Sequence, residues 1–226
     1  MPATCTLRAP QRTELLHRSL LVRHLGERWV AGTAPVDEVA AVSLLTALGP
    51  GDVLVVADAG ARRAAAAAAQ LFGTDVTVTD APARVAVPDG ERLVHAVCAP
   101  VGPHELILVL PGSPVTGSRR TAFVPLLSLD GADVETSTCA ATAAVAAARA
   151  GTGPTALGLR APAPGCDPVR VLVNRMRADH QLDEHALRAI DRDARTVALG
   201  AGPGCWVPAQ LPPAQLPPAE LPPARL

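Results

Sequence analysis

VLVVADAGARRAAAAAAQLFGTDVTVTD, residues 53–80, is the stretch of sequence that decides the fold class. It opens with the apolar run 53–57, which is typical of a strand buried on both faces. The alanine-rich run 61–72 is a strong helix former that Gly73 ends. The run 74–80 is rich in β-branched residues and predicts a second strand. A strand, a helix and a strand of these lengths predict a βαβ unit with parallel strands.

The same alternation continues on both sides of this stretch. Residues 35–48 begin with Pro and acidic residues and carry apolar residues at helical spacing, so they predict a helix. Together these segments predict a doubly wound, mainly parallel α/β sheet with helices on both faces, which is a Rossmann-like three-layer sandwich. The further expected elements are strands at 93–98, 106–110, 133–138, 169–173 and 196–199, and helices at 118–129, 140–150 and 182–193.

The chain length favours one domain with appendages. We expect an N-terminal helical segment at 1–32, a Rossmann-like domain at 33–206 and a Pro-rich disordered tail at 207–226, where Leu-Pro-Pro-Ala repeats favour polyproline II geometry. The tail is interpreted as an inert or semi-rigid extension rather than a ligand for a proline-binding domain. The N-terminal segment is expected to be either a packing helix or the contact of a homo-oligomer. Its apolar residues at near-helical spacing are Leu15, Leu16, Leu20, Leu21 and Leu25.

The amino-acid composition excludes several classes of function. The chain has no Lys, so a Schiff-base lysine, a pyridoxal phosphate anchor and a phosphate-loop lysine are excluded. It also has no Tyr and a single Asn, Asn174, a bias that a high-GC bacterial genome explains. Aromatic residues make up only 2% of the chain and the net charge is −1, so nucleic acid is not an expected partner.

The termini and cysteines bear on location. The chain has no window of 18 or more uncharged apolar residues, and residues 1–20 mix charged with apolar positions, so we expect a cytoplasmic protein with no membrane partner. The number of cysteines is odd and they form no C-x-x-C pair, so we expect them to be reduced and mostly buried. They are Cys5, Cys98, Cys139, Cys166 and Cys205.

A small-molecule site is expected where the first strand gives way to its helix. In open α/β sheets, ligands bind at the carboxyl ends of the strands. Asp58 and Gly60 follow the first strand, and Asp80 ends the next strand 20 residues beyond Gly60. A glycine turn at a helix N-terminus admits a ligand to the backbone, and an acid at the next strand end accepts hydrogen bonds from ribose hydroxyls. This spacing indicates a nucleoside-binding site, and the alternative is a plain βα turn with a solvated acid.

Residues 35–151 resemble the core of class I S-adenosylmethionine-dependent methyltransferases. The resemblance rests on the DAGA turn, the strand ending at Asp80, and the HELILVLP and LDGADVETST segments that begin at 104 and 129. It implies a Rossmann-like fold and S-adenosylmethionine as the cofactor.

By the same resemblance, Asp58, Gly60 and Asp80 would hold the cofactor, and Leu110 and Pro111, after the fourth strand, would lie toward the substrate. The family's acid-x-Gly-x-Gly turn is reduced here to Asp58-x-Gly60-x-Arg62, as a degenerate, non-catalytic member would also show. No catalytic base is assigned.

Residues 48–80 also resemble the start of the sugar-phosphate sensor domain of DeoR-type repressors. That resemblance implies a non-catalytic effector-binding or scaffolding domain. Only about thirty residues precede Ala34, which are too few for the winged helix-turn-helix of those repressors.

Two further groups of residues could carry chemistry. His180, Glu184 and His185 lie in an acidic segment, where a divalent metal site or simple helix capping could explain them, and the spacing favours capping. We therefore expect no metal. Cys139, expected between a strand and a helix, is either a nucleophile activated by the helix N-terminus or a small buried residue, and the second interpretation is favoured.

The serines and a pair of arginines complete the candidates. Ser113, Ser118 and Ser137 lack a G-x-S-x-G elbow, which argues against a serine hydrolase. Arg119 and Arg120 could contact an anion, although paired arginines on a helix are usually solvated.

Overall fold

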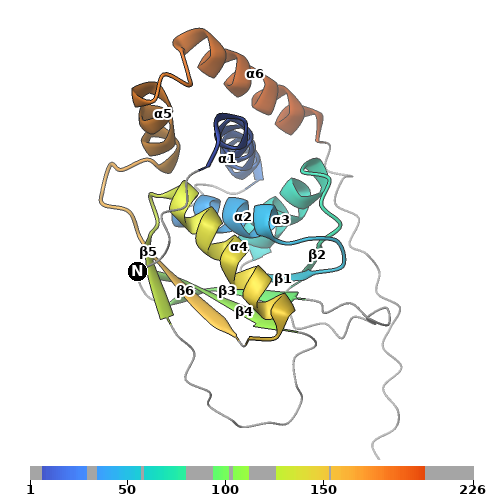
Figure 1. Cartoon of the computed structure of the whole chain (residues 1–226). Coiled ribbons are helices and arrows are strands. Elements are labelled where there is room, and N and C mark those ends of the chain that lie inside the picture. Colours follow the sequence, from blue (N-terminus) through green and yellow to red (C-terminus); the bar gives the residue numbers. More distant parts are fainter. Residues whose placement is uncertain are drawn as a thin grey trace, which may run out of the picture.

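A computed structural model describes residues 7–29, 35–56, 59–79, 94–101, 104–111, 126–152 and 154–201. These residues form a mixed α/β fold in which helices are stacked over a six-stranded sheet (Figure 1). The elements in chain order are α1 (Ala9–Trp29), α2 (Pro35–Ala47), β1 (Val53–Val56), α3 (Ala59–Leu71), β2 (Thr77–Thr79), β3 (Val94–Val101), β4 (His104–Pro111), β5 (Leu126–Asp130), α4 (Val134–Ala150), β6 (Thr155–Arg160), α5 (Pro168–Ala178) and α6 (Glu184–Gly200).

The sheet is mixed, with strand order β2-β1-β3-β4-β6-β5. β1 pairs in parallel with β2 and β3, and β5 pairs in parallel with β6. β4 runs antiparallel to both of its neighbours, β3 and β6. The sheet therefore has a β1-α3-β2 unit at one end, a β5-α4-β6 unit at the other, and an antiparallel pair between them.

The helices form layers over one face of this sheet. α2, α3 and α4 lie directly on the strands, α1 packs on α2 and α3, and α5 and α6 lie outermost (Figure 1). All helices of the described segments are on this face, so these segments do not show the second helical layer of a doubly wound sandwich. The predicted α/β class is confirmed in this coarser form. Within the described ranges, no helix combines the length and the apolar content needed to span a bilayer.

The alternation predicted from 35 to 110 is confirmed. The predicted helices at 35–48 and 61–72 are α2 and α3, and the strands predicted at 53–57 and 74–80 are β1 and β2. The strands predicted at 93–98 and 106–110 lie within β3 and β4.

The predictions between 118 and 138 are wrong where the structure describes them. The predicted helix at 118–129 ends in residues that form β5, whereas 118–125 lie outside the described residues. The predicted strand at 133–138 is the start of α4. The reason is local: Asp133 accepts hydrogen bonds from the backbone N–H and the hydroxyl of Thr136, and this N-cap overrides the β propensity of the following residues.

Two more predicted strands belong to helices. The apolar run 169–173 lies in α5, because Asp167 caps the helix by accepting a hydrogen bond from the N–H of Val169, and Pro168 suits its first turn. The predicted strand at 196–199 is the end of α6. β6 was not predicted.

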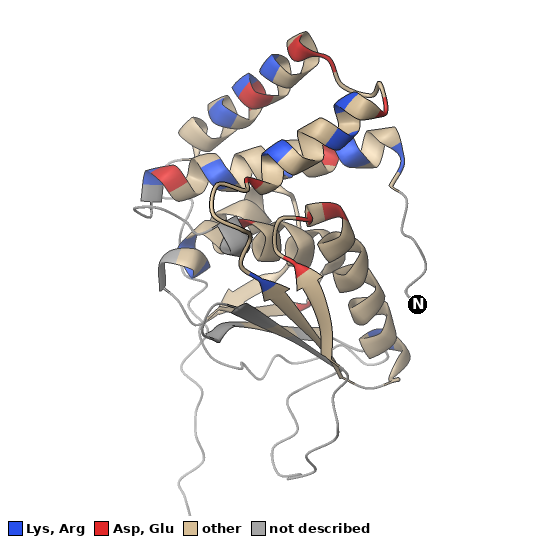
Figure 2. Cartoon of the chain, turned by 90° about the vertical axis from the view of Figure 1, so that its left-hand side faces the viewer, with Lys and Arg blue, Asp and Glu red and all other residues tan. Residues whose placement is uncertain are grey.

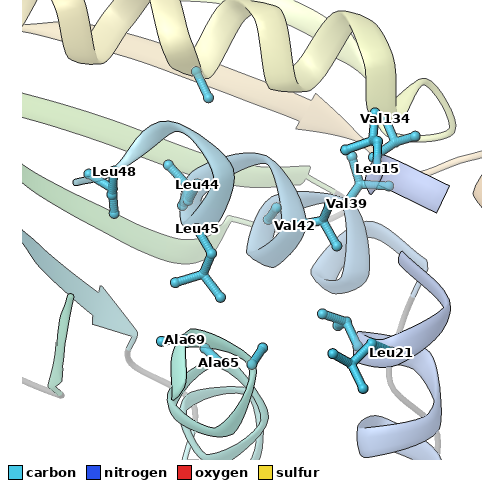
Figure 3. Close-up of a cluster of buried hydrophobic side chains, with 14 of the residues drawn as sticks. Leu15, Leu21, Val39, Val42, Leu44, Leu45, Leu48, Ala65, Ala69 and Val134 are labelled. Atoms are coloured by element: carbon cyan, nitrogen blue, oxygen red, sulfur yellow. The ribbon is translucent and has the colours of Figure 1, made fainter. Parts of the chain in front are cut away.

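The core is continuous from α1 to the sheet. Figure 3 shows Leu15 of α1 next to Val39 of α2 and Val134 of α4, and Leu21 of α1 and Ala65 and Ala69 of α3 on the lower side of α2, all within one buried cluster. The leucines of α1 considered for an oligomer contact are buried within the chain, and Leu16 and Leu25 are both 0% exposed. α1 is thus a packing helix of the same core. Residues 1–6 and the tail at 207–226 lie outside the described residues.

Charged residues gather on α1, α5 and α6, the upper helices of Figure 2. One arginine, Arg23, joins three helices: it donates to Glu38 of α2 at 2.9 Å and to Asp167 at the start of α5 at 2.7 Å. Arg12 joins α1 to Glu135 of α4 at 2.6 Å and also pairs with Asp179 after α5. These pairs fix the outer helices to the layer beneath them.

Candidate functional site

The parallel half of the sheet defines one edge where strands end together. In the register of β1 and β3, Val56 is level with Cys98, and β3 continues to Val101 beyond that point. β2 runs in the same direction on the other side of β1. The carboxyl ends of β1 and β2 therefore lie at one edge, with β3 extending past them. This is the position at which open α/β sheets bind ligands.

The N-terminus of α3 lies at this edge. α3 begins at Ala59, three residues after the last residue of β1, and Gly60 is in its first turn. The first backbone N–H groups of a helix have no partner within the helix and carry a partial positive charge, so they can bind an anionic group.

The two acidic residues predicted for this site flank the described elements. Asp58 directly precedes α3, and Asp80 directly follows Thr79, the last residue of β2. Both lie outside the described residues. Of the predicted cofactor residues, the structure therefore places Gly60 at this edge, and the chain positions of Asp58 and Asp80 adjoin it.

Leu110 and Pro111 are not brought to the same edge. Because β4 runs antiparallel to β3, Pro111 is paired with Val94 and Leu110 with His95, at the start of β3. The end of β1 is level with Cys98, four residues further along β3, which corresponds to about 13 Å. Leu110 and Pro111 thus lie at the opposite edge from Gly60, because the fourth strand is not parallel as the family resemblance implies.

Beneath the start of α3 the molecule is apolar and almost filled. A cavity of about 30 Å³ lies between α2, α3 and the ends of β1 and β3, and Val56, Ala61 and Cys98 are among its lining residues. That volume has room for one water molecule. A nucleoside could therefore contact only the outer side of this edge, beyond the strand ends.

Two arginines, Arg62 and Arg63, lie within the first two turns of α3. Arg63 is exposed and Arg62 is partly buried. Sequence reasoning treated them only as departures from a glycine turn. Next to the positive end of the α3 dipole, an exposed guanidinium further favours a carboxylate or phosphate group.

Cys139 is not a thiol in this structure. It is disulfide-bonded, whereas Cys98 and Cys166 are not part of a disulfide. The prediction of reduced cysteines is therefore wrong for Cys139, and the disulfide leaves no thiolate there to act as a nucleophile. The cause lies in chain topology, which can join cysteines that are widely separated in sequence.

The acidic segment before α6 acts as a helix cap, as predicted. Asp183 accepts a hydrogen bond from the N–H of Ala186 at 2.7 Å. Glu184 pairs with Arg177 and Arg188. His180 lies in the turn before α6 with φ of 56°, so it does not share a helix face with Glu184. Across the described ranges, no group of three or more His, Cys, Asp or Glu residues could hold a metal ion.

Of the remaining candidates, Ser137 lies within the described residues. Ser137 is buried in α4, and its hydroxyl makes no hydrogen bond among the described residues. Ser113, Ser118, Arg119 and Arg120 lie outside the described residues.

Comparison with known proteins adds no relative. No protein-family model matches the chain, and no curated protein matches it. The methyltransferase and sensor-domain resemblances therefore rest on the quoted residues alone.

Proposed function

We propose that this chain binds a nucleoside-containing small molecule at the outer side of the β1–α3 turn. The observation that carries the proposal is the β1-α3-β2 unit with β3 parallel to β1 on its other side. In Rossmann-like folds such a unit holds the nucleoside. Here it brings strand ends, a helix N-terminus and Gly60 to one edge.

The chemistry of the edge suits a ligand with both an anionic group and a ribose. The N–H groups of α3, with Arg63 nearby, would bind a carboxylate or phosphate. Asp80, next in the chain after β2, would accept hydrogen bonds from the ribose hydroxyls. S-adenosylmethionine carries both groups and supplies an activated methyl group when bound. We therefore propose it as the first ligand to test, with methyl transfer, or binding by a degenerate member of the methyltransferases, as the function.

A non-catalytic effector-binding or scaffolding domain is the second candidate. The observation that favours it is the apolar cavity under α3: among its lining residues, Cys98 is the only one with a titratable side chain. No general base has been placed at this edge within the described residues. A sugar phosphate would meet the helix N-terminus and the arginine through its phosphate alone.

Titration calorimetry with S-adenosylmethionine, S-adenosylhomocysteine and ribose 5-phosphate separates these functions. The test variant is Asp80→Ala. The matched control is Asp75→Ala, because Asp75 is an exposed acid just before the opposite end of β2. Circular dichroism of each variant establishes that it is folded.

We expect the nucleoside ligands to bind the wild-type protein and Asp75→Ala, and to lose at least tenfold in affinity for Asp80→Ala, since a hydrogen-bonded charge is worth about 1.5–3 kcal/mol. Binding of ribose 5-phosphate alone would move the function to an effector domain. No heat with any of these ligands would refute the proposed site.

A further inference from the structure

α6 is one of the two outermost helices and lies over α1 (Figure 1). Its inward side packs on the core through the buried Ala194 and Ala198 and through the partly buried Leu187, Ile190 and Val197. Alanine side chains bury little apolar surface, and the larger side chains are covered only in part, so apolar packing stabilises α6 less than a helix of the central core. The polar contacts at its flanks therefore matter for how firmly α6 is held.

Three residues of α1 make such polar contacts, and we name these residues with their α6 partners the α1–α6 junction. His24 Nε2 lies 2.9 Å from Oδ1 of Asp191. His17 Nε2 lies 3.0 Å from Oδ2 of Asp193. Arg28 donates to carbonyl groups at the end of α6 at 2.9 Å. The two aspartates are two positions apart, or about 200° around the helix axis, so the two histidines contact opposite sides of α6.

His24 has a carboxylate at both of its ring nitrogens. Besides the contact with Asp191, its Nδ1 lies 3.4 Å from Oε2 of Glu27. An ionised carboxylate only accepts hydrogen bonds, whereas a neutral imidazole has one N–H donor and one acceptor nitrogen. The imidazolium form alone can therefore donate to both carboxylates. The His24 side chain is 9% exposed, so water replaces little of a contact that the neutral ring loses.

His17 does not have this constraint. Within the described residues its ring contacts one carboxylate, that of Asp193, which is 69% exposed. A neutral ring with its proton on Nε2 keeps this hydrogen bond. His17 is therefore a matched comparison for His24 on the same pair of helices.

The other charges around His24 are bound elsewhere. Arg195 of α6 pairs with Oδ2 of Asp191 at 3.7 Å, on the oxygen that His24 does not contact. Arg23, the residue before His24, is bound to carboxylates of α2 and of the start of α5. In the part of the chain that the structure describes, neither α3 nor any other element adds a further ion pair to His24. Its charge state is therefore coupled to Glu27 and Asp191.

We propose that His24 is a pH-sensitive latch, which holds α6 on α1 when its ring is protonated and loosens α6 when the ring loses its proton. Histidine is the side chain that changes charge in the physiological pH range. The docked helix favours the protonated ring, because both N–H groups then have an acceptor. Docking is therefore firmest on the acid side of this range and weakens as the pH rises. The latch acts on a different pair of helices from the β1–α3 turn.

Hydrogen–deuterium exchange of the full chain tests the latch. Exchange is measured at about pH 5.5 and about pH 8.5, on either side of the ordinary histidine range, and the rates are converted to protection factors to remove the intrinsic effect of pH. For the wild-type protein we expect the protection of the α6 amides at 188–199 to fall about fivefold at the higher pH, because a charged donor forms a stronger hydrogen bond than a neutral one. The amides of α4 at 141–148 are the reference and should keep their protection.

Three variants assign the effect. His24→Gln can still donate to Asp191 but carries no charge, so α6 should be less protected at the lower pH and should show no further fall. His17→Gln is the matched control and should retain the wild-type fall. In Glu27→Gln the new amide can donate to an unprotonated Nδ1, so this variant should show a smaller fall than the wild-type protein.

Equal protection of α6 at the two pH values in the wild-type protein would overturn the latch, and so would a wild-type fall in His24→Gln. A fall in α4 as large as that in α6 would show a loss of global stability and would overturn it as well. Circular dichroism establishes that each variant is folded. Glu27 is 66% exposed, so Glu27→Gln carries the test if His24→Gln does not fold, and the full wild-type fall in Glu27→Gln then overturns the proposal.

Discussion

At the scale of single residues, Arg23 is a largely buried cation that forms ion pairs with two carboxylates. It donates to both Glu38 and Asp167, and the Glu38 side chain is only 10% exposed. Burial raises the pKa of Glu38, and the hydrogen bonds from Arg23 offset this only in part. The pKa of Arg23 itself lies above its ordinary value, because its bonds to Asp167 and Glu38 outweigh the opposite effect of burial.

Replacing Arg23 by Ala should destabilise the fold strongly. The change leaves Glu38 buried without its counter-charge, a loss of about 3 kcal/mol in the free energy of unfolding. The control is Arg188→Ala: Arg188 is 73% exposed and pairs with the exposed Glu184, so it should cost less than about 1 kcal/mol. Urea denaturation at neutral pH measures both values. Equal losses in the two variants would show that the buried pair contributes no more than a surface pair.

At the scale of elements, the helices and strands that could be predicted are those whose local sequence favours a single secondary structure. The alanine run of α3 favours a helix and the apolar run of β1 favours a buried strand, and both are observed. The run 169–173 is different, because four apolar residues and one arginine after a proline suit a buried strand as well as a helix. The hydrogen bond that Val169 donates to Asp167 decides for the helix. Such a cap is visible only once the backbone is placed.

Asp133, the N-cap of α4, should make the free energy of unfolding depend on pH in the acid range. Burial alone would raise the pKa of Asp133, but hydrogen bonds from Arg175 and Thr136 outweigh it, so this pKa lies below the ordinary value of 3.8. A carboxyl group with a lowered pKa stabilises the fold above its unfolded pKa, and this contribution is lost as the pH falls from there toward the folded pKa.

Asp133→Asn should reduce this acid dependence. An Asn can still cap the helix by accepting the N–H of Thr136, but it removes the charge that faces Arg175. The free energy of unfolding should therefore fall less between pH 5 and pH 3, roughly, in Asp133→Asn than in the wild-type protein, as measured by urea denaturation. The opposite contribution of Glu38, whose pKa is raised, is common to both proteins and cancels in the comparison. Identical slopes would contradict the role given to this carboxylate.

At the candidate site too, features that depend on neighbouring residues in the chain could be predicted, and features that depend on the arrangement of the whole sheet could not. The turn at Gly60 could be predicted because it depends on neighbouring residues of one βαβ unit. The opposite placement of Leu110 and Pro111 could not, because it depends on whether β4 runs parallel or antiparallel to β3. The direction of a strand follows from the connection that precedes it and from its neighbours in the sheet, and periodicity carries no information about it. The disulfide of Cys139 was missed for the same reason.

At the scale of the whole molecule, α1 decides whether the N-terminal segment is an appendage or part of the fold. A boundary at 32/33 was predicted because the leucines at 15–25 have helical spacing and the alternation of strands and helices begins only after them. Yet α1 contacts α2, α3, α5 and α6, and its leucines belong to the same buried cluster as β1 and α4. A helix in the middle of stacked layers cannot leave without exposing the apolar surfaces on both of its sides. The chain should therefore unfold as one unit that includes α1.

The substitution Leu16→Ala tests whether α1 unfolds together with the rest of the fold. Leu16 is 0% exposed, so the change should cost about 2–5 kcal/mol, whereas Leu199→Ala, at a side chain 65% exposed on α6, should change the stability by no more than about 0.5 kcal/mol. If α1 and the sheet unfold together, native-state hydrogen exchange of the slowest amides in α1, α2 and β1 will report one common free energy, and Leu16→Ala will lower all three by the same amount. An appendage would behave differently: the amides of α1 would exchange through a cheaper opening, and the substitution would leave those of β1 unchanged. Loss of protection confined to α1 would thus support the boundary at 32/33, because only a helix that separates on its own can lose a core leucine without lowering the stability of the strands beneath it.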